Sequence, residues 1–300
     1  MKDRLKTLII RAGALGDTLM LMPAICGLRK DTGIIIIGRR PGIDYLRPYV
    51  DQCVDIETSG LHRLFMEDAD NLSGLSLPSP DLVAAFLNDP DGRLTCRLKA
   101  CFPESSINIF PVFPPEKDKR HIALYMAKAI QETGIPIDAD YVFKESFKFP
   151  LMPPKTSVPG ERGLVVIHPG SGSRVKNYPP AFWLQLIREI KRMQLDNAGR
   201  MLLLMGPAEE DVLPVMRDTL KGMDIAVSVL PEKEELISIL ARASVYIGHD
   251  SGVTHLAAML GTHVIALFNE SPINRWRPLG PNVRIIAKSD FKAFPDNSPL

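Results

Sequence analysis

The residues best suited to chemistry form a glycine- and serine-rich loop, HPGSGSRVKNYPP (168–180), between an apolar run and a helix. Backbone N–H groups around Gly172, the hydroxyls of Ser171 and Ser173 and the ammonium group of Lys176 offer several donors to a diphosphate without a metal ion. The loop lacks the GxxxxGK[ST] spacing of a Walker A sequence. A plain surface loop with a solvated lysine explains the same residues equally well.

A second candidate anion site is the turn HDSGVTH (249–255), which links a strand to a short helix. The residues that we assign to donor binding here are Asp250, Ser251, Gly252, Thr254 and His255. Hydroxyl, imidazole and free backbone N–H groups in a first helical turn can converge on an anion. The same pattern also fits an ordinary N-cap followed by a buried structural histidine.

Acidic residues follow another buried strand in the segment GPAEED (206–211). A carboxylate can accept hydrogen bonds from two vicinal hydroxyls, so we assign Glu209 to the ribose of a nucleotide, with Glu210 as second choice. Three acids in a first helical turn are also favoured by the helix dipole alone.

The fourth segment is RAGALGD (11–17), in which a strand ends at Arg11 and a turn from Gly13 to Gly16 leads into a helix. Asp17 at the start of that helix is stabilised by the dipole and by free N–H groups, so helix capping alone explains it. The spacing is not GxGxxG, and the next strand is followed by arginines in place of an acidic residue. A nicotinamide enzyme is therefore disfavoured.

Short apolar runs alternate with amphipathic stretches along the whole chain, which is typical of βαβ units around parallel sheets. The strands that we expect are 7–11, 33–38, 81–87, 106–110, 163–168, 201–205, 225–230, 244–248, 263–268 and 283–287. This pattern predicts an α/β fold with two Rossmann-like domains of mainly parallel sheets. The carboxyl ends of both sheets are expected to face a central cleft.

The proline-rich segment KFPLMPPKTSVPGER (148–162) interrupts this alternation, because proline can neither continue a helix nor complete a ladder of hydrogen bonds. We therefore expect an N-terminal domain over residues 1–150 and a C-terminal domain over residues 151–300.

Composition and charge narrow the class of protein. The chain has 36 Lys and Arg against 35 Asp and Glu, a net charge of +1, so no overall field favours nucleic acid, and we expect no nucleic-acid partner. The four cysteines have neither zinc-site nor disulfide spacing, and His62, His121, His168, His249 and His263 have no ligand-like spacing. We predict no metal site. The apolar run near the N-terminus is too short for a signal peptide, which predicts a cytoplasmic protein.

Taken together and in this order, the four segments resemble glycosyltransferase family 9, the heptosyltransferases of the lipopolysaccharide core. The resemblance is carried by RAGALGDTLMLMPAI, HPGSGSRVKNYP, GPAEE and HDSGVTHLAAMLGTHVIALF. It implies a GT-B architecture, a nucleotide diphosphate sugar such as ADP-heptose in the C-terminal domain, and a glycolipid or glycan acceptor in the N-terminal domain. It also implies inversion at the anomeric carbon without a metal or any other cofactor.

The resemblance further implies roles for individual residues. Asp17 is similar to the family's general base and Lys176 to its phosphate-neutralising cation, while Ser171 matches a diphosphate-binding hydroxyl. The turn of Asp250, Ser251, Gly252 and His255 is similar to the donor-binding turn. We place Arg11, Gly13 and Gly16 at the acceptor.

Three alternatives stay open from the sequence. One is a glycosyltransferase that uses another nucleotide sugar, and the second is a sugar-nucleotide epimerase of the same fold. The third is a protein that binds a nucleotide sugar without turnover. A lipid-linked acceptor would also require peripheral contact with the inner face of the inner membrane.

Overall fold

The computed structural model describes residues 4–28, 32–66, 79–154, 163–193, 200–206, 214, 216, 218, 220–223 and 225–290. The chain divides into two compact units, residues 1–147 and 148–300. The boundary between them lies at the start of the proline-rich segment KFPLMPPKTSVPGER.

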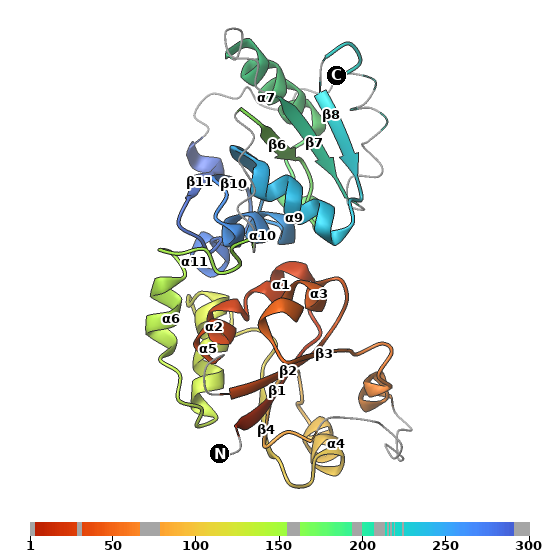
Figure 1. The fold of residues 1–300 in the computed structure, drawn as a ribbon, viewed down its shortest axis with the longest axis vertical. Coiled ribbons are helices and arrows are strands. Elements are labelled where there is room, and N and C mark those ends of the chain that lie inside the picture. The colour runs from red at the N-terminus through yellow and green to blue at the C-terminus, as the bar shows by residue number, and fades with distance from the viewer. Residues whose placement is uncertain are drawn as a thin grey trace. The chain divides into compact units, whose positions relative to one another are not determined.

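Unit 1 is built on a five-stranded parallel sheet in the order β3-β2-β1-β4-β5 (Figure 1). Its strands are β1 (Leu5–Arg11), β2 (Thr32–Gly38), β3 (Gln52–Asp55), β4 (Leu82–Phe86) and β5 (Ser106–Phe110). The central strands β1, β2 and β4 are almost continuously buried. Their runs of Ile, Leu, Val and Ala suit a parallel sheet that is covered on both faces.

Helices cover both faces of this sheet. The helices of unit 1 are α1 (Leu15–Leu19), α2 (Met22–Leu28), α3 (Gly42–Leu46), α4 (Arg93–Cys101), α5 (Ile122–Glu132) and α6 (Ala139–Glu145), with 3-10 turns η1 (Arg47–Tyr49) and η2 (Leu61–Phe65). Alternate residues of the strands, such as Leu8 and Ile10, form one core with η2 and α4. Helices α2, α5 and α6 pack together in a separate layer.

Unit 2 contains a six-stranded parallel sheet in the order β11-β10-β9-β6-β7-β8. Its strands are β6 (Val165–His168), β7 (Met201–Met205), β8 (Ile225–Val229), β9 (Val245–His249), β10 (Val264–Phe268) and β11 (Val283–Ala287). Its helical elements are α7 (Pro180–Met193), α9 (Lys233–Arg242), α10 (Gly252–Leu260) and α11 (Ile273–Trp276), with 3-10 turns η3 (Arg174–Lys176) and η5 (Lys288–Asp290).

Two helical layers also enclose the sheet of unit 2. Trp183 and Ile187 of α7 pack on strand residues such as Ile167 and Leu203. Helix α10 packs against β9, β10 and α9. The sheet therefore presents its two sets of alternating side chains to two different helical layers.

Each sheet has a topological switch point, where the strand order reverses. In unit 1 the reversal lies between β1 and β4, and in unit 2 it lies between β6 and β9. Ligands of open parallel sheets bind outside the carboxyl ends of the strands at such points, because the loops there diverge. Residues 12–17 follow β1, and residues 169–179 and 250–252 follow β6 and β9.

The structure confirms the fold class predicted from the sequence, with two mainly parallel sheets of α/β type. All ten expected strands are present, with ends that differ by at most a few residues. Strand β3 was missed, because Gln52–Asp55 is a short edge strand of mixed polarity.

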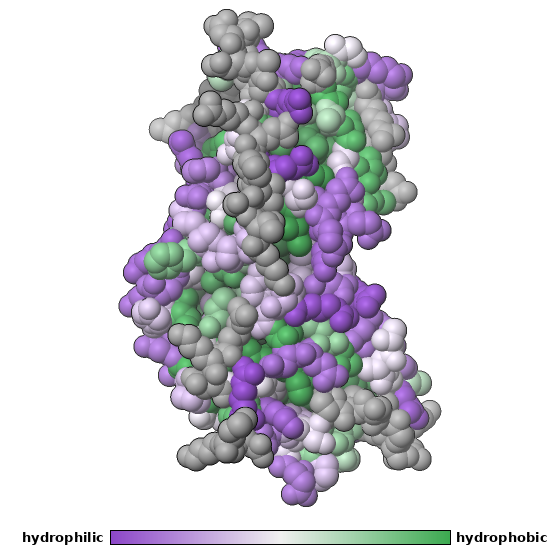
Figure 2. Space-filling model, viewed as in Figure 1, coloured by the Kyte–Doolittle hydropathy of each residue, from purple (hydrophilic) through white to green (hydrophobic). Residues whose placement is uncertain are grey.

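Hydrophilic and hydrophobic residues are interspersed over the molecular face drawn in Figure 2. A helix that crosses a membrane needs a long apolar stretch. No helix within the described parts of the chain meets that requirement.

Candidate active site

Arg11, the last residue of β1, is buried at the switch point of unit 1 and only 1% exposed. Its Nη1 donates a hydrogen bond to the carbonyl oxygen of Val112 at 3.1 Å. Its guanidinium carbon lies 4.8 Å from the centre of the Phe113 ring, and its Nη2 lies 3.7 Å from Oδ1 of Asp17. The arginine is thus fixed from three sides.

The guanidinium of Arg11 keeps unused binding capacity. Burial lowers its pKa, and the nearby charge of Asp17 opposes that effect. Its Nε and Nη2 are buried without a hydrogen-bond partner among the described residues. A cavity of about 470 Å³ adjoins it and is lined by Arg11, Ala12, Arg39, Ile56, Glu57, His62, Phe65, Phe86, Leu87, Asn88 and Val112. An anionic group in this cavity would satisfy the two nitrogens.

Asp17 lies in the short helix α1, and 24% of its side chain is exposed. Its Oδ2 accepts a hydrogen bond from the backbone N–H of Ala14 at 3.2 Å, which is the capping role that the sequence also allowed. A Cβ atom on Gly13 would lie 2.5 Å from the Cβ of Asp17. The glycine at position 13 therefore makes room for the carboxylate. Gly16 lies one residue before Asp17 in α1.

The loop that follows β6 is closed by Ser171, which is 4% exposed. The Ser171 hydroxyl lies 2.7 Å from Oδ1 of Asn177, to which it can donate, and it accepts from the backbone N–H of Ser173 at 3.3 Å. Gly172 is exposed at the tip, with open space where a Cβ would stand. Ser171 thus stabilises the loop through its hydrogen bonds, and the exposed backbone near Gly172 is the part of the loop that a ligand can contact.

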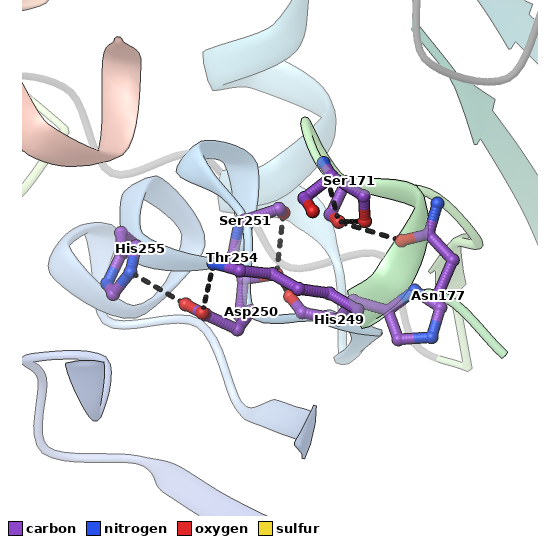
Figure 3. Close-up of polar contacts among 9 residues, drawn as sticks. Ser171, Asn177, His249, Asp250, Ser251, Thr254 and His255 are labelled. Carbon is purple, nitrogen blue, oxygen red and sulfur yellow. Dashed lines mark hydrogen bonds and ion pairs between the residues drawn. The ribbon is translucent and has the colours of Figure 1, made fainter. Parts of the chain in front are cut away.

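Asp250 directly follows β9, and its carboxylate lies between an ammonium group and an imidazole ring (Figure 3). Its Oδ2 accepts a hydrogen bond from Nζ of Lys176 at 2.7 Å, and its Oδ1 lies 3.3 Å from Nε2 of His255. Lys176 also lies 5.8 Å from the centre of the Trp276 ring. The structure therefore brings Lys176, Asp250 and His255 together. Lys176 and Asp250 are 74 residues apart in the sequence.

The charge of Asp250 is held by its neighbours. Burial opposes ionisation of this carboxyl, which is 4% exposed, but the hydrogen bond with His255 and the charge of Lys176 outweigh burial and hold its pKa well below the ordinary range. His255 is 2% exposed, and its Nδ1 is buried without a hydrogen-bond partner among the described residues. Lys176 keeps 34% of its side chain exposed, so it is the group of this cluster that can reach a ligand.

Ser251 is the N-cap of α10, the structural role that the sequence allowed for it. Its Oγ accepts from the backbone N–H of Thr254 at 3.3 Å, and Gly252 is the first residue of the helix. Thr254 is fully buried, and its hydroxyl donates to the carbonyl oxygen of His249. The Thr254 hydroxyl is therefore directed into the protein, whereas the sequence suggested that it could meet an anion directly.

Two histidines that the sequence left as structural residues also lie at this switch point. Burial lowers the pKa of His168 to about 3 and that of His249 to about 4, so both are neutral at physiological pH. The Nε2 atom of His249 accepts from the backbone N–H of Tyr178 at 2.8 Å. Their positions in the sequence could have identified them, because each is the last residue of a strand beside the switch point.

Glu209, the predicted ribose ligand, lies outside the described residues. Within the described ranges, no three His, Cys, Asp or Glu side chains are grouped closely enough to hold a metal ion.

Solved structures share this fold over nearly the whole chain. The E. coli heptosyltransferase WaaC with ADP matches at a TM-score of 0.67 and 15% identity, covering 95% of this chain and 94% of that one. A glycosyltransferase family 9 protein from Veillonella parvula matches at 0.66 and 17%, covering 96% and 87%. The E. coli ADP-heptose lipopolysaccharide heptosyltransferase II matches at 0.64 and 15%, covering 94% and 90%. The architecture is therefore that of the GT-B glycosyltransferases.

A model of glycosyltransferase family 9 (heptosyltransferase) matches residues 114–298 of the sequence. A search of the curated proteins finds no match. The chain belongs to glycosyltransferase family 9, as its sequence motifs indicated. Membership in this family makes it a glycosyltransferase and disfavours the epimerase and the binding protein without turnover.

Proposed function

We propose that this enzyme transfers heptose from ADP-heptose to an acceptor of the lipopolysaccharide core, with inversion and without a metal ion. Residues 151–300 bind the nucleotide sugar, and residues 1–150 bind the acceptor. The description of the family and the binding of ADP by WaaC, which has the same fold, support this choice of donor.

The observation that carries the proposal is the contact of Lys176 with Asp250, which in turn meets His255. A departing diphosphate develops negative charge, and a cation fixed nearby stabilises that charge in the transition state. Asp250 holds the lysine 2.7 Å away, which reduces the freedom that Lys176 would lose on binding. Backbone N–H groups near Gly172 and the hydroxyl of Ser251 add donors for the same phosphates.

Asp17 is proposed as the general base. Its partly exposed carboxylate can accept the proton of an acceptor hydroxyl, as general base catalysis requires. Arg11 is proposed to hold an anionic group of the acceptor through Nε and Nη2, which have no hydrogen-bond partner among the described residues. An acidic sugar or a phosphate in the adjacent cavity of about 470 Å³ would meet this requirement.

The proposed reaction is a single displacement at the anomeric carbon of the donor sugar. The acceptor oxygen forms a bond to the anomeric carbon of the donor sugar while its proton passes to Asp17. The bond between the anomeric carbon and the phosphate oxygen breaks, and its electron pair leaves with ADP. Attack from the face opposite the leaving group inverts the configuration, and Lys176 offsets the charge of the released diphosphate.

Contact with a membrane surface is part of the proposal because a lipid-linked acceptor lies there. Phe65 and Met66 at the end of η2 are 49% and 54% exposed, and Phe65 also lines the cavity beside Arg11. Cosedimentation with anionic liposomes at low salt is expected, and its absence would contradict this part of the proposal.

The test begins with calorimetric binding of ADP, UDP, GDP, CDP and TDP in the presence of EDTA. Selective binding of ADP is expected. Release of ADP from ADP-heptose is then measured with a core acceptor that lacks heptose. Preference for another nucleotide would retain the transferase and reject heptose from ADP-heptose, whereas an activity that requires a divalent ion would reject the proposed role of Lys176.

Lys176→Ala tests the leaving-group role. Affinity for ADP and turnover are both expected to fall, by about tenfold or more for the loss of one charged contact. Lys221→Ala is the matched control, because Lys221 is 78% exposed and forms an ion pair with Asp218 on the surface. Equal losses in the two variants would contradict the assignment.

A further inference from the structure

A buried series of hydrogen-bonded side chains connects β6, β9 and α10 next to Ser251. Nδ1 of His168 lies 3.1 Å from the hydroxyl oxygen of Tyr246, and that oxygen lies 3.1 Å from Oγ1 of Thr254. His168 is 5% exposed, and Tyr246 and Thr254 are fully buried. Buried polar groups are costly unless they are hydrogen-bonded, so the order of hydrogens along this series matters.

The position of the Tyr246 ring depends on the glycine at position 248 of the same strand. These two residues are two positions apart in β9 and so face the same side of the sheet. His168 is the parallel partner of Gly248 in β6, and the rings of His168 and Tyr246 are 6.4 Å apart. A Cβ atom on residue 248 would lie 2.6 Å from the Tyr246 hydroxyl. The absence of a side chain at Gly248 lets the phenol reach His168 and Thr254.

Each hydroxyl group in this series has one hydrogen, which determines which atom donates in each contact. The carbonyl group of His249 can only accept, so the single hydroxyl hydrogen of Thr254 is used there. Oγ1 of Thr254 must then be the acceptor in its contact with Tyr246. The hydroxyl of Tyr246 has only one hydrogen, so its contact with His168 needs a hydrogen on Nδ1. His168 is neutral, since burial lowers its pKa to about 3, and a neutral imidazole carries one N–H hydrogen, which this contact assigns to Nδ1.

Ser251 gains a free hydrogen from this arrangement. Its Oγ lies 3.0 Å from Oγ1 of Thr254, and it accepts from the backbone N–H of Thr254. Because Tyr246 already donates to Thr254, the hydroxyl hydrogen of Ser251 is not needed to satisfy Thr254. It can turn toward a ligand oxygen without leaving a buried oxygen unsatisfied.

We propose that Tyr246 is a positioning residue that frees the hydroxyl hydrogen of Ser251 for a phosphate oxygen of the nucleotide. The inference rests on the proposed function, because it assumes that Ser251 contacts the diphosphate. Without the phenolic hydroxyl, Ser251 becomes the donor to Thr254, and the phosphate loses a hydrogen bond. Tyr246 acts through Thr254 and Ser251 and does not touch the donor itself.

A double-mutant cycle with ADP as the probe tests this route. Calorimetry is performed on the wild type, Tyr246→Phe, Ser251→Ala and the double variant. Tyr246→Phe and Ser251→Ala are each expected to weaken ADP binding about tenfold, the size of one hydrogen bond to a charged group. The double variant is expected to bind no more weakly than Ser251→Ala alone, since Tyr246 has no effect once its target is gone.

The control for loss of a phenolic hydroxyl is Tyr141→Phe, because Tyr141 is 59% exposed in unit 1. It should leave ADP affinity unchanged. Unchanged affinity in Tyr246→Phe, or a further tenfold loss when it is added to Ser251→Ala, would overturn the inference while the proposed function stands. If the wild type binds no nucleoside diphosphate, the proposed function fails and the inference fails with it.

A measurement on the wild type makes the test independent of variant folding. Long-range proton–nitrogen NMR spectra of the labelled protein distinguish the two neutral tautomers of histidine. The resonances of His168 are identified by their absence in His168→Gln. A hydrogen on Nδ1 of His168 is the expected result, and a hydrogen on Nε2 would overturn the proposed order of donors.

Discussion

The two switch points of this enzyme differ in how closely their charged side chains are paired, at 2.7 Å between Lys176 and Asp250 and at 3.7 Å between Arg11 and Asp17. In unit 2, Asp250 contacts both Lys176 and His255, and Ser251 and Thr254 contact each other. In unit 1, Arg11 retains two buried nitrogens without hydrogen-bond partners among the described residues, and Asp17 is partly exposed. The same kind of sheet therefore supports one pre-assembled cluster, in which Lys176 and Asp250 are already hydrogen-bonded, and one cluster in which two guanidinium nitrogens of Arg11 remain to bind a ligand.

This difference suits the proposed division of the reaction. A diphosphate presents fixed negative charges, and a cluster that is already ordered binds it without further cost of ordering. A general base must instead meet a hydroxyl whose proton it removes, so it needs an accessible oxygen. Variants in unit 1 should therefore lower turnover without a change in nucleotide affinity, whereas variants in unit 2 should lower nucleotide affinity as well.

The largest expected effect is that of Asp17→Asn on turnover. Loss of a positioned general base is expected to lower kcat by about 10²- to 10⁴-fold, while ADP affinity stays unchanged. Steady-state kinetics and calorimetry check the two quantities. Asp140→Asn, at an exposed position in α6, serves as the control. A variant Asp17→Asn with normal kcat would exclude this residue as the base.

Gly13→Ala and Gly172→Ala compare the two glycine-bearing loops directly. The new methyl group at position 13 would lie 2.5 Å from the Cβ of Asp17 and displace it. Misplacement of a catalytic group by about 1 Å can cost about 100-fold in rate. The methyl group at position 172 meets no atom within 4 Å, so stability should change by less than about 0.5 kcal/mol. Steady-state kinetics and thermal unfolding are measured for both variants. Equal losses of rate in Gly13→Ala and Gly172→Ala would contradict the expected difference between the two loops.

Asp250→Asn tests the pre-assembled cluster of unit 2. The variant keeps the shape of the side chain but removes the charge that holds Lys176 and His255. ADP affinity is expected to fall about tenfold, and the free energy of unfolding by about 1–3 kcal/mol. Calorimetry and urea unfolding measure these changes. An unchanged affinity for ADP would show that Lys176 needs no partner to bind phosphate.

A dependence of stability on pH is also expected to originate in unit 2. His168 and His249 have pKa values lowered to about 3 and 4 in the folded protein, against about 6.5 in the unfolded chain. Below about pH 6.5 the unfolded chain binds protons that the folded chain does not. Stability therefore falls as pH falls from about 6.5 to 4, by up to about 1.4 kcal/mol per pH unit for each histidine.

Urea unfolding at several pH values checks this dependence, and His168→Gln should reduce the slope by about one proton. An unfolding free energy that does not change between pH 6.5 and 4 would contradict the burial of both histidines.

Much of the fold could be read from the sequence because parallel strands that are buried on both faces are nearly continuous apolar runs. The run MLLLM corresponds to the largely buried strand β7 without any change of boundary. Strand β3 was missed because an edge strand has one unpaired side and needs no apolar run. Glycine-rich turns after β1, β6 and β9 likewise marked the loops that lie at the switch points.

The sequence by itself therefore determined the two parallel sheets, the loops at their carboxyl ends and the family. Only the tertiary structure decided which side chains meet, because contacts between residues far apart in sequence depend on strand order and register. Lys176 meets Asp250 across 74 positions, and His168 meets Tyr246 across 78. It also decided direction, since the buried hydroxyl of Thr254 donates inward to a carbonyl group while Lys176 keeps part of its side chain in solvent. Spacing along a chain does not encode such directions, because they arise from packing of β6, β9 and α10 against one another.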